Sequence, residues 1–340
     1  MTRIPLHKGQ RDQTNRELEP TVLSRKAEAA GSYTAFSGVE LGQYDMWRQF
    51  LQRLRPWVLA LLLPLNGCLV STHTLRRVEM PSHVMTASAD QLIGSINKRC
   101  EAITSLSAIV DLQLIEGGPK KGKQTTSTSF SGTILERKPA SLRVSVRLPV
   151  IGTTAVDMAT EGQTFTLWVP VRNEAFEGAN TVTTESQNPL ENIRPNVFSD
   201  SLLLACIAPS DLVTLTSETK TLLDQKAKHL LAQPDYDLMV LGRKGNQELI
   251  TERVIHFNRT DLTPYQVDIY DQNGAIQTEA TYGPMETFGE ISFPKTIAIK
   301  RPFDELQIQI TFDKLSVNLP LPRDKFELTL PADTTIHKLD

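Results

Sequence analysis

The chain has 340 residues and a formal net charge of −3 at pH 7, with 40% hydrophobic and 22% charged residues. This length suits one large domain or two small ones. The slight acidic excess argues against a nucleic-acid-binding protein and against a polybasic attachment to anionic lipid, because both depend on clustered basic residues.

Residues 1–45 are polar, carry scattered charges and lack a sustained hydrophobic period, as is typical of a disordered extension. Met46 is followed by Trp47 and Arg48 and would be a natural start for a signal peptide of ordinary length. We therefore interpret residues 1–45 as a disordered extension or as the result of an over-called start codon, and we leave them out of the fold prediction.

Residues 46–67 have the order of features found in a secretory signal peptide. Arginines precede an apolar segment that runs from Trp57 to Leu65, and small residues follow it. The segment is too short to span a bilayer, since a helix needs about 17 to 25 apolar residues to do so. The alternative is a buried core helix whose terminal Gly-Cys pair is a coincidence.

The segment ends in a sequence that resembles the lipobox of bacterial lipoproteins, Leu65-Asn66-Gly67-Cys68, although Asn66 is an unusual residue at its position. The resemblance implies that Cys68 receives a diacylglycerol, becomes the first mature residue and is then N-acylated, which gives a stable membrane anchor. Neither residue after Cys68 is the aspartate that retains lipoproteins in the inner membrane of enterobacteria-like systems. The resemblance therefore implies anchoring at the periplasmic side of the outer membrane.

Residues 68–85 would contain the lipidated cysteine and a polar tether, and one domain is predicted over residues 86–335. This domain begins with an amphipathic helix that Ser88 could cap. The helix is predicted because apolar residues recur at three- and four-residue steps, namely Leu92, Ile93, Ile96, Cys100, Ile103 and Leu106.

The hydrophobic period then changes to two in residues 110–114, 142–148 and 165–169, which predicts strands with one apolar face. Residues 173–195 are rich in loop signals and predict a mobile excursion. Residues 196–207 predict a second, very apolar helix that stops before Pro209, and a third helix is considered over residues 222–231.

Strands resume in the second half, at residues 236–241, 249–257, 265–270, 276–282, 291–300 and 306–317. Asn273-Gly274 predicts a hairpin with a type I′ turn. In total, about eleven strands and two or three helices predict an α+β fold with a single strongly curved antiparallel sheet, an unclosed half-barrel, wrapping the helices. A β-sandwich is the alternative, but it would leave the apolar helix after residue 196 without a place to pack.

This order of elements resembles the LolA/LolB lipoprotein-carrier superfamily over about residues 86–335. Local features that fit are Lys138-Pro139 before a strand, Gly162 before another, and Phe293-Pro294 opening a late strand. The resemblance implies an unclosed barrel with a helical lid and a cavity that holds acyl chains, and the lipobox favours the LolB-like, membrane-anchored side. None of the family's functional residues can be matched to a position in this chain.

An apolar cavity could bind an acyl chain without any catalytic group, because each buried methylene contributes about 0.8 kcal/mol. A solid, close-packed core is the alternative. The candidate lining residues are Leu92, Ile96, Ile103, Val144, Val146, Leu167, Leu203, Ile269, Ile299 and Ile310.

Cys100 and Cys206 are far apart in the sequence. They could form one disulfide in an oxidising envelope or remain two separate buried thiols, and the sequence leaves both open.

No pattern in the sequence indicates an enzyme. Histidines are isolated from one another and none has a partner at a metal-ligand spacing, and the nucleophile-elbow and P-loop motifs are absent. We expect no catalytic residues, no metal, and no cofactor beyond the acyl groups on Cys68.

The predicted function is that of a monomeric, outer-membrane-anchored lipoprotein on the periplasmic side that binds lipid or lipoprotein acyl chains and exchanges them with the membrane or with a soluble carrier. The alternative is a non-enzymatic scaffold that assists an envelope protein complex through residues 173–195.

Overall fold

A computed structural model describes residues 77–182, 186–223 and 229–339. These residues belong to one compact unit. The predicted signal peptide, the lipobox Leu65-Asn66-Gly67 and Cys68 lie outside the described residues. The domain boundaries and the lipid anchor stay predictions.

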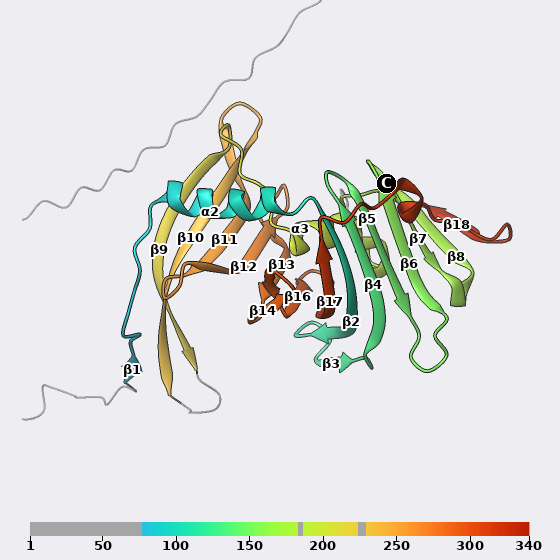
Figure 1. Cartoon of the computed structure of the whole chain (residues 1–340), viewed down its shortest axis with the longest axis horizontal. Coiled ribbons are helices and arrows are strands. Elements are labelled where there is room, and N and C mark those ends of the chain that lie inside the picture. The colour runs from blue at the N-terminus through green and yellow to red at the C-terminus, as the bar shows by residue number, and fades with distance from the viewer. Residues whose placement is uncertain (1–76, 183–185, 224–228, 340) are drawn as a thin grey trace, which may run out of the picture. The chain divides into compact units, whose positions relative to one another are not determined.

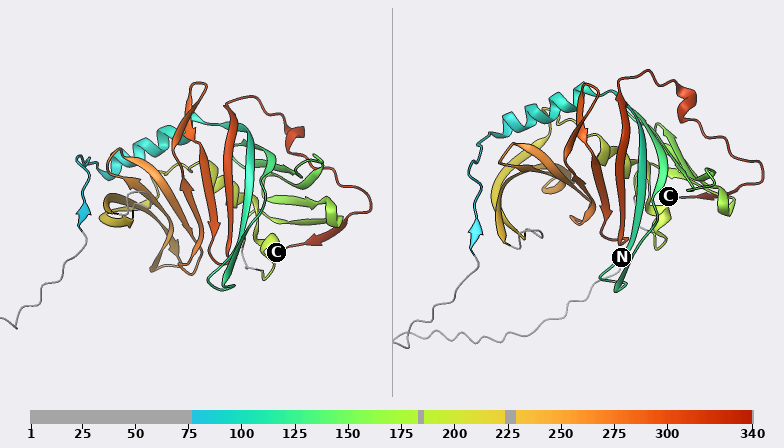
Figure 2. Two further views of the ribbon diagram at one scale, coloured as in Figure 1. Left: turned by 90° about the horizontal axis from the view of Figure 1, so that it is seen from below. Right: turned by 60° about the horizontal axis from the view of Figure 1, so that its bottom comes forward.

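Within the described residues, sixteen strands form one sheet, and β14 and β15 form a separate hairpin. The large sheet curves strongly and does not close (Figure 2). Its order is β1-β10-β11-β12-β13-β16-β17-β2-β4-β5-β6-β7-β8-β18, with β3 paired to β2 and β9 paired to β10. All pairings are antiparallel except those of β1 with β10 and of β18 with β8.

The strands in chain order are β1 Val78–Glu79, β2 Ser105–Gly118, β3 Lys123–Thr126, β4 Phe130–Arg137, β5 Ser141–Arg147, β6 Thr154–Glu161, β7 Thr164–Val169, β8 Glu174–Ala179 and β9 Leu212–Leu223. They continue as β10 Leu230–Lys244, β11 Glu248–Asn258, β12 Thr263–Tyr270, β13 Ile276–Tyr282, β14 Met285–Phe288, β15 Ile291–Pro294, β16 Thr296–Arg301, β17 Leu306–Val317 and β18 Thr335–Lys338. The helices are α2 Ala89–Ala102 and α3 Pro195–Leu202, with short 3-10 turns η2 Pro170–Arg172, η3 Pro189–Asn192 and η4 Arg323–Phe326.

The predicted α+β class and the single unclosed sheet are confirmed, and the β-sandwich alternative is wrong. The number of strands exceeds the predicted eleven or so, because short strands such as β3, β8 and β18 carry little hydrophobic alternation.

Helix α2 forms where its sequence predicts it. The Ser88 hydroxyl accepts a hydrogen bond from the Gln91 amide, and the Gln91 side chain accepts one from the Ser88 amide, which completes a capping box. Leu92 and Ile96 point into a core that also contains Leu238, Ile255 and Phe257. We call α2 together with β9–β12 the α2 half of the sheet (Figure 1).

Helix α3 ends at Leu202, five residues before the predicted end. Long-range contacts hold the following residues in an extended path instead. The Asn97 side chain donates to the Ile207 carbonyl at 2.9 Å and accepts from its amide at 2.8 Å. Phe198 and Leu202 of α3 pack onto a second core formed by β16, β17, β2 and β4–β8, and these elements are called the α3 half.

Cys100 and Cys206 form a disulfide, with Cα atoms 5.4 Å apart and a sequence separation of 106. This bond joins the last turn of α2 to the extended segment that follows α3. It resolves the alternative that the sequence left open.

Three local predictions are wrong. Residues 222–231 contain no helix in their described part, because the ends of β9 and β10 pair there. The region 173–195, predicted as a loop, contains β8 and η3. Of the turn residues only Gly274 has a positive φ, so the turn is not type I′; Asp271 instead accepts bonds from the amides of Asn273 and Ala275.

Candidate functional site

The α3 half encloses a groove of about 470 Å³ between its sheet and α3. Strands β2, β4, β5, β6, β7 and β17 supply the floor and walls, and residues of η3 and α3 cover it. Most of the lining is aliphatic or aromatic: Leu112, Leu114, Phe130, Val144, Val146, Ala155, Val156, Met158, Leu167, Ile193, Phe198, Leu306 and Ile308.

The alternation of the strands explains this lining. Val144 and Val146 on β5 point to the inner face, while Ser145 between them lies on the opposite face. Leu167 on β7, two strands along the sheet from β5, lines the same groove. Leu306 and Ile308 on β17 are alternate residues in the same way, whereas β6 also contributes the consecutive residues Ala155 and Val156.

Polar side chains line the groove where the strands end. Lys121 and Arg172 are exposed cations there, and within the described part of the chain neither side chain forms an ion pair. The Glu305 carboxylate accepts hydrogen bonds from the backbone amides of Lys120 and Lys121 and so fixes the β2–β3 turn beside the opening. The groove thus combines an apolar interior with a polar, partly cationic rim.

A buried polar network supports the same end of the groove. Arg301 Nε donates to Asp304 Oδ2 at 3.0 Å, and Asp304 Oδ1 accepts from Asn192 Nδ2 at 2.6 Å. The side chains of Arg301 and Asp304 are 1% and 2% exposed. The network joins η3 to the β16–β17 turn and thereby holds the cover of the groove in place.

The structure distributes the ten predicted lining residues over several places. Val144, Val146 and Leu167 line the groove. Ile103 and Leu203 line a second cavity, and Ile269 lines two further, more polar cavities of about 720 and 240 Å³. Leu92, Ile96, Ile299 and Ile310 are fully buried in the two cores, where other side chains surround them.

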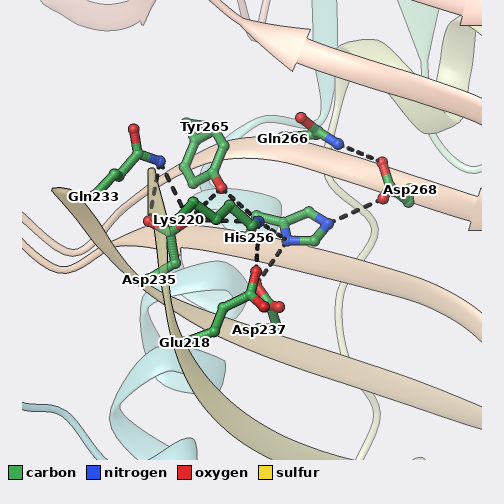
Figure 3. Close-up of polar contacts among 9 residues, drawn as sticks. All are labelled: Glu218, Lys220, Gln233, Asp235, Asp237, His256, Tyr265, Gln266 and Asp268. Atoms are coloured by element: carbon green, nitrogen blue, oxygen red, sulfur yellow. Dashed lines mark hydrogen bonds and ion pairs between the residues drawn. The ribbon is translucent and has the colours of Figure 1, made fainter. Parts of the chain in front are cut away.

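A polar cluster on the α2 half was not predicted from the sequence (Figure 3). His256 lies between two carboxylates, with Nδ1 2.7 Å from Asp237 and Nε2 3.0 Å from Asp268. Lys220 and Tyr265 continue the cluster, since the Lys220 ammonium donates to the Tyr265 hydroxyl at 3.0 Å. Its neighbours Ile255 and Phe257 pack with α2, so His256 lies on the opposite face of β11.

Charges define this cluster. Burial alone would lower the pKa of His256, but its hydrogen bonds and charge interactions with Asp237 and Asp268 outweigh burial and raise the pKa to about 9. Burial, together with a hydrogen bond to Asp235, raises the pKa of Tyr265 to about 12. None of the cavities described above is lined by His256, so the cluster acts as a closed network that joins β9, β10, β11 and β12.

Across residues 77–182, 186–223 and 229–339, no group of three or more His, Cys, Asp or Glu side chains is arranged to hold a metal ion. In the same ranges, no helix has the length and apolar character needed to cross a bilayer.

No protein-family model matches the chain, and no curated protein matches its sequence. Solved structures are similar in fold. A LolA superfamily protein from Nitrosomonas europaea has a TM-score of 0.45 and 11% identity, over 72% of this chain and 99% of its own. A DUF1329 family protein from Desulfovibrio piger has a TM-score of 0.44 and 13% identity, over 69% of this chain and 94% of its own. A domain from Vibrio parahaemolyticus, named for outer membrane lipoprotein sorting, has a TM-score of 0.43 and 13% identity over the same shares. Each likeness concerns the fold alone.

Proposed function

We propose that the chain is a non-enzymatic, lipid-anchored envelope protein that binds acyl chains in the groove of the α3 half. The observation that carries this proposal is the cavity of about 470 Å³ with a mainly aliphatic lining. Such a surface contributes about 0.8 kcal/mol for each methylene that a ligand buries and requires no reacting group.

The polar rim fits a ligand with a hydrophilic end. Lys121 and Arg172 stand where a headgroup or peptide attached to the acyl chain would emerge. The two cations would attract an anionic group of any kind, because ion pairs between exposed charges are weak and do not require one fixed geometry. A lipoprotein or phospholipid would satisfy both the groove and its rim.

The hairpin between β5 and β6 brings an apolar tip to the same end of the groove. Val150 and Ile151 are 106% and 73% exposed. Val150 also has a φ of 70°, a left-handed conformation that is costly for a β-branched residue. Val146 and Val156, on the two strands of this hairpin, line the groove, so a tip in contact with a membrane would bring the opening close to lipid.

The proposed anchor is a diacylglycerol and an N-acyl chain on Cys68, and the proposed location is the periplasmic side of the outer membrane. A short tether from Cys68 would keep the groove within reach of the bilayer. The proposed partners are membrane lipid, lipoprotein acyl chains and a soluble carrier that delivers them.

Filling the groove tests the proposal. Val146→Trp places a large side chain inside the cavity, whereas Ser145→Trp places the same side chain on the opposite face of β5. The probe is a synthetic peptide with an N-terminal diacylglyceryl-cysteine, titrated by fluorescence anisotropy. We expect Val146→Trp to raise Kd by about tenfold or more, because the ligand loses more than about 1.4 kcal/mol of contact. Ser145→Trp should leave Kd unchanged, and equal Kd values for both variants would refute acyl binding in this groove.

A further inference from the structure

A second cavity, of about 330 Å³, lies between the ends of α2 and α3 and the β14–β15 hairpin. Much of its wall is apolar, with Ile103, Leu202, Leu203, Ile291 and Phe293 among its residues. Tyr282 lines it and contacts both cores, so the cavity is at the junction between the two halves of the sheet. None of its lining residues belongs to the first groove.

One ammonium group enters this apolar wall. Lys138 Nζ donates to the Cys100 carbonyl and lies 3.4 Å from Cys100 Sγ, and within the described residues it forms no salt bridge. Burial is the main cause that lowers the pKa of Lys138, and the interaction with Glu136, when that carboxyl is ionised, opposes it to a smaller extent. The cation is therefore held among apolar groups without an adjacent carboxylate partner.

Glu136 does not neutralise this charge at pH 7. Burial is the main cause that raises the pKa of Glu136 to about 8, so the carboxyl is mostly protonated at neutral pH. Arg99 and Glu290 are the remaining charged residues of the lining, and both are exposed, where solvent screens them. Asp200, whose pKa is raised by burial to about 6, is largely ionised at pH 7 but does not line this cavity, so the lining itself favours an anion next to Lys138.

A second donor points to the same kind of ligand. The Tyr282 hydroxyl is buried and has no hydrogen-bond partner among the described residues. Burial, and to a smaller extent the charge of Asp200, raise its pKa above the ordinary range, which keeps the hydroxyl protonated and able to donate. Buried polar groups in proteins are nearly always satisfied, so this unpaired hydroxyl, on a residue of the cavity lining, is available to an acceptor that reaches it.

We infer that this second cavity binds a single-chain aliphatic carboxylate, with the carboxylate between the Lys138 ammonium and the Tyr282 hydroxyl and the hydrocarbon against Ile103, Leu203 and Phe293. A lone carboxylate satisfies both donors, while the apolar wall accommodates the chain. The inference is independent of the proposed function, because the two cavities share no residue.

The test compares decanoate with decanol by isothermal titration calorimetry on the full chain. These ligands have the same hydrocarbon and differ in the headgroup, so their affinity ratio reports the carboxylate site. We expect decanoate to bind at least about tenfold more tightly, in line with charge-assisted hydrogen bonds. Lys138→Met should abolish the preference, and Tyr282→Phe, which keeps the ring and removes only the donor, should reduce it.

Two controls keep the result specific. Lys121→Met removes a cation from the rim of the first groove and should leave the preference for decanoate intact. Val146→Trp fills the first groove and should also leave it intact. The inference is overturned if decanoate and decanol bind equally, if Lys138→Met and Tyr282→Phe fold normally and retain the wild-type ratio, or if Val146→Trp abolishes decanoate binding. The last outcome would assign decanoate to the first groove and leave the proposed function standing.

Discussion

The two halves of the sheet differ in how completely a helix covers them. The α2 half presents β9–β12 to a helix of 14 residues, and its core is closed around Leu92 and Ile96. The α3 half presents eight strands to a helix of 8 residues, and a groove remains.

Simple dimensions account for this difference. At about 1.5 Å per residue, α2 is roughly 21 Å long and α3 roughly 12 Å. Eight neighbouring strands at about 4.8 Å spacing extend over roughly 34 Å, so α3 cannot cover the apolar face of its half. A cavity can therefore arise where a short helix lies on a wide sheet, without any special lining residue.

The disulfide ties the last turn of α2 to the segment that follows α3, and its removal has the largest expected effect. A crosslink that closes a loop of 106 residues restricts the unfolded chain, which corresponds to about 4–5 kcal/mol of stability. We expect the double variant Cys100→Ser, Cys206→Ser to lose this amount in urea unfolding followed by circular dichroism. Wild-type protein in reductant should match the double variant, and a loss below about 1 kcal/mol would show that the bond contributes little.

Equal truncations in the two halves measure the difference in packing directly. Leu92 in the α2 half is 1% exposed and surrounded by core residues, whereas Leu114 in the α3 half lines the groove and is only partly buried. Leu92→Ala should cost about 3 kcal/mol, since it leaves a new cavity in a close-packed core. Leu114→Ala should cost about 1 kcal/mol, because one side of Leu114 already faces empty space. Similar losses in thermal unfolding would mean that the groove is as well packed as the α2 core.

The sequence predicts the α2 half better than the α3 half, for a physical reason. Helix α2 depends on local signals, namely the Ser88–Gln91 capping box and a three- and four-residue period. The end of α3 depends on distant residues, because Asn97 and Cys100 hold residues 206 and 207 in an extended path. No local pattern in residues 196–207 carries that information.

The same limit applies to the groove. Period-two alternation places Val146 and Ile310 alike on apolar inner faces, yet Val146 lines the groove and Ile310 is fully buried. Which inner-facing residues border empty space depends on where α3 ends. The His256 cluster was not predicted either. Its carboxylates Asp237 and Asp268 are 19 and 12 residues away from His256 in the sequence, and only the strand register brings them next to it. Asp235 and Asp237 within an otherwise apolar strand were the available signal.

The pH dependence of the free energy of unfolding should distinguish the two halves, because each half contains a buried group with a raised pKa. The pKa of His256 in the α2 half is raised to about 9, above an unfolded value of about 6.5. A raised histidine pKa stabilises the fold fully below about pH 6.5, and this stabilisation is lost as the pH rises through about 9. We expect a loss of about 2 kcal/mol over this interval in urea unfolding at fixed ionic strength, which is less than the full pKa shift corresponds to because solvent screens part of the interaction. His256→Gln should be less stable than wild type at pH 6 and should not show this loss.

Glu136 in the α3 half acts in the same direction over a lower range. Its raised pKa of about 8 means that the folded state binds a proton more tightly than the unfolded state, whose pKa is near 4.5, so stability falls as the pH rises between these values. Glu136→Gln should remove its own part of the pH dependence, between about 4.5 and 8, and leave the part between about 6.5 and 9, which belongs to His256 with its partners Asp237 and Asp268 and the nearby Lys220 and Tyr265. If Glu136→Gln also removed the upper part, the two halves would titrate as one coupled system, and the separation of their cores would be wrong.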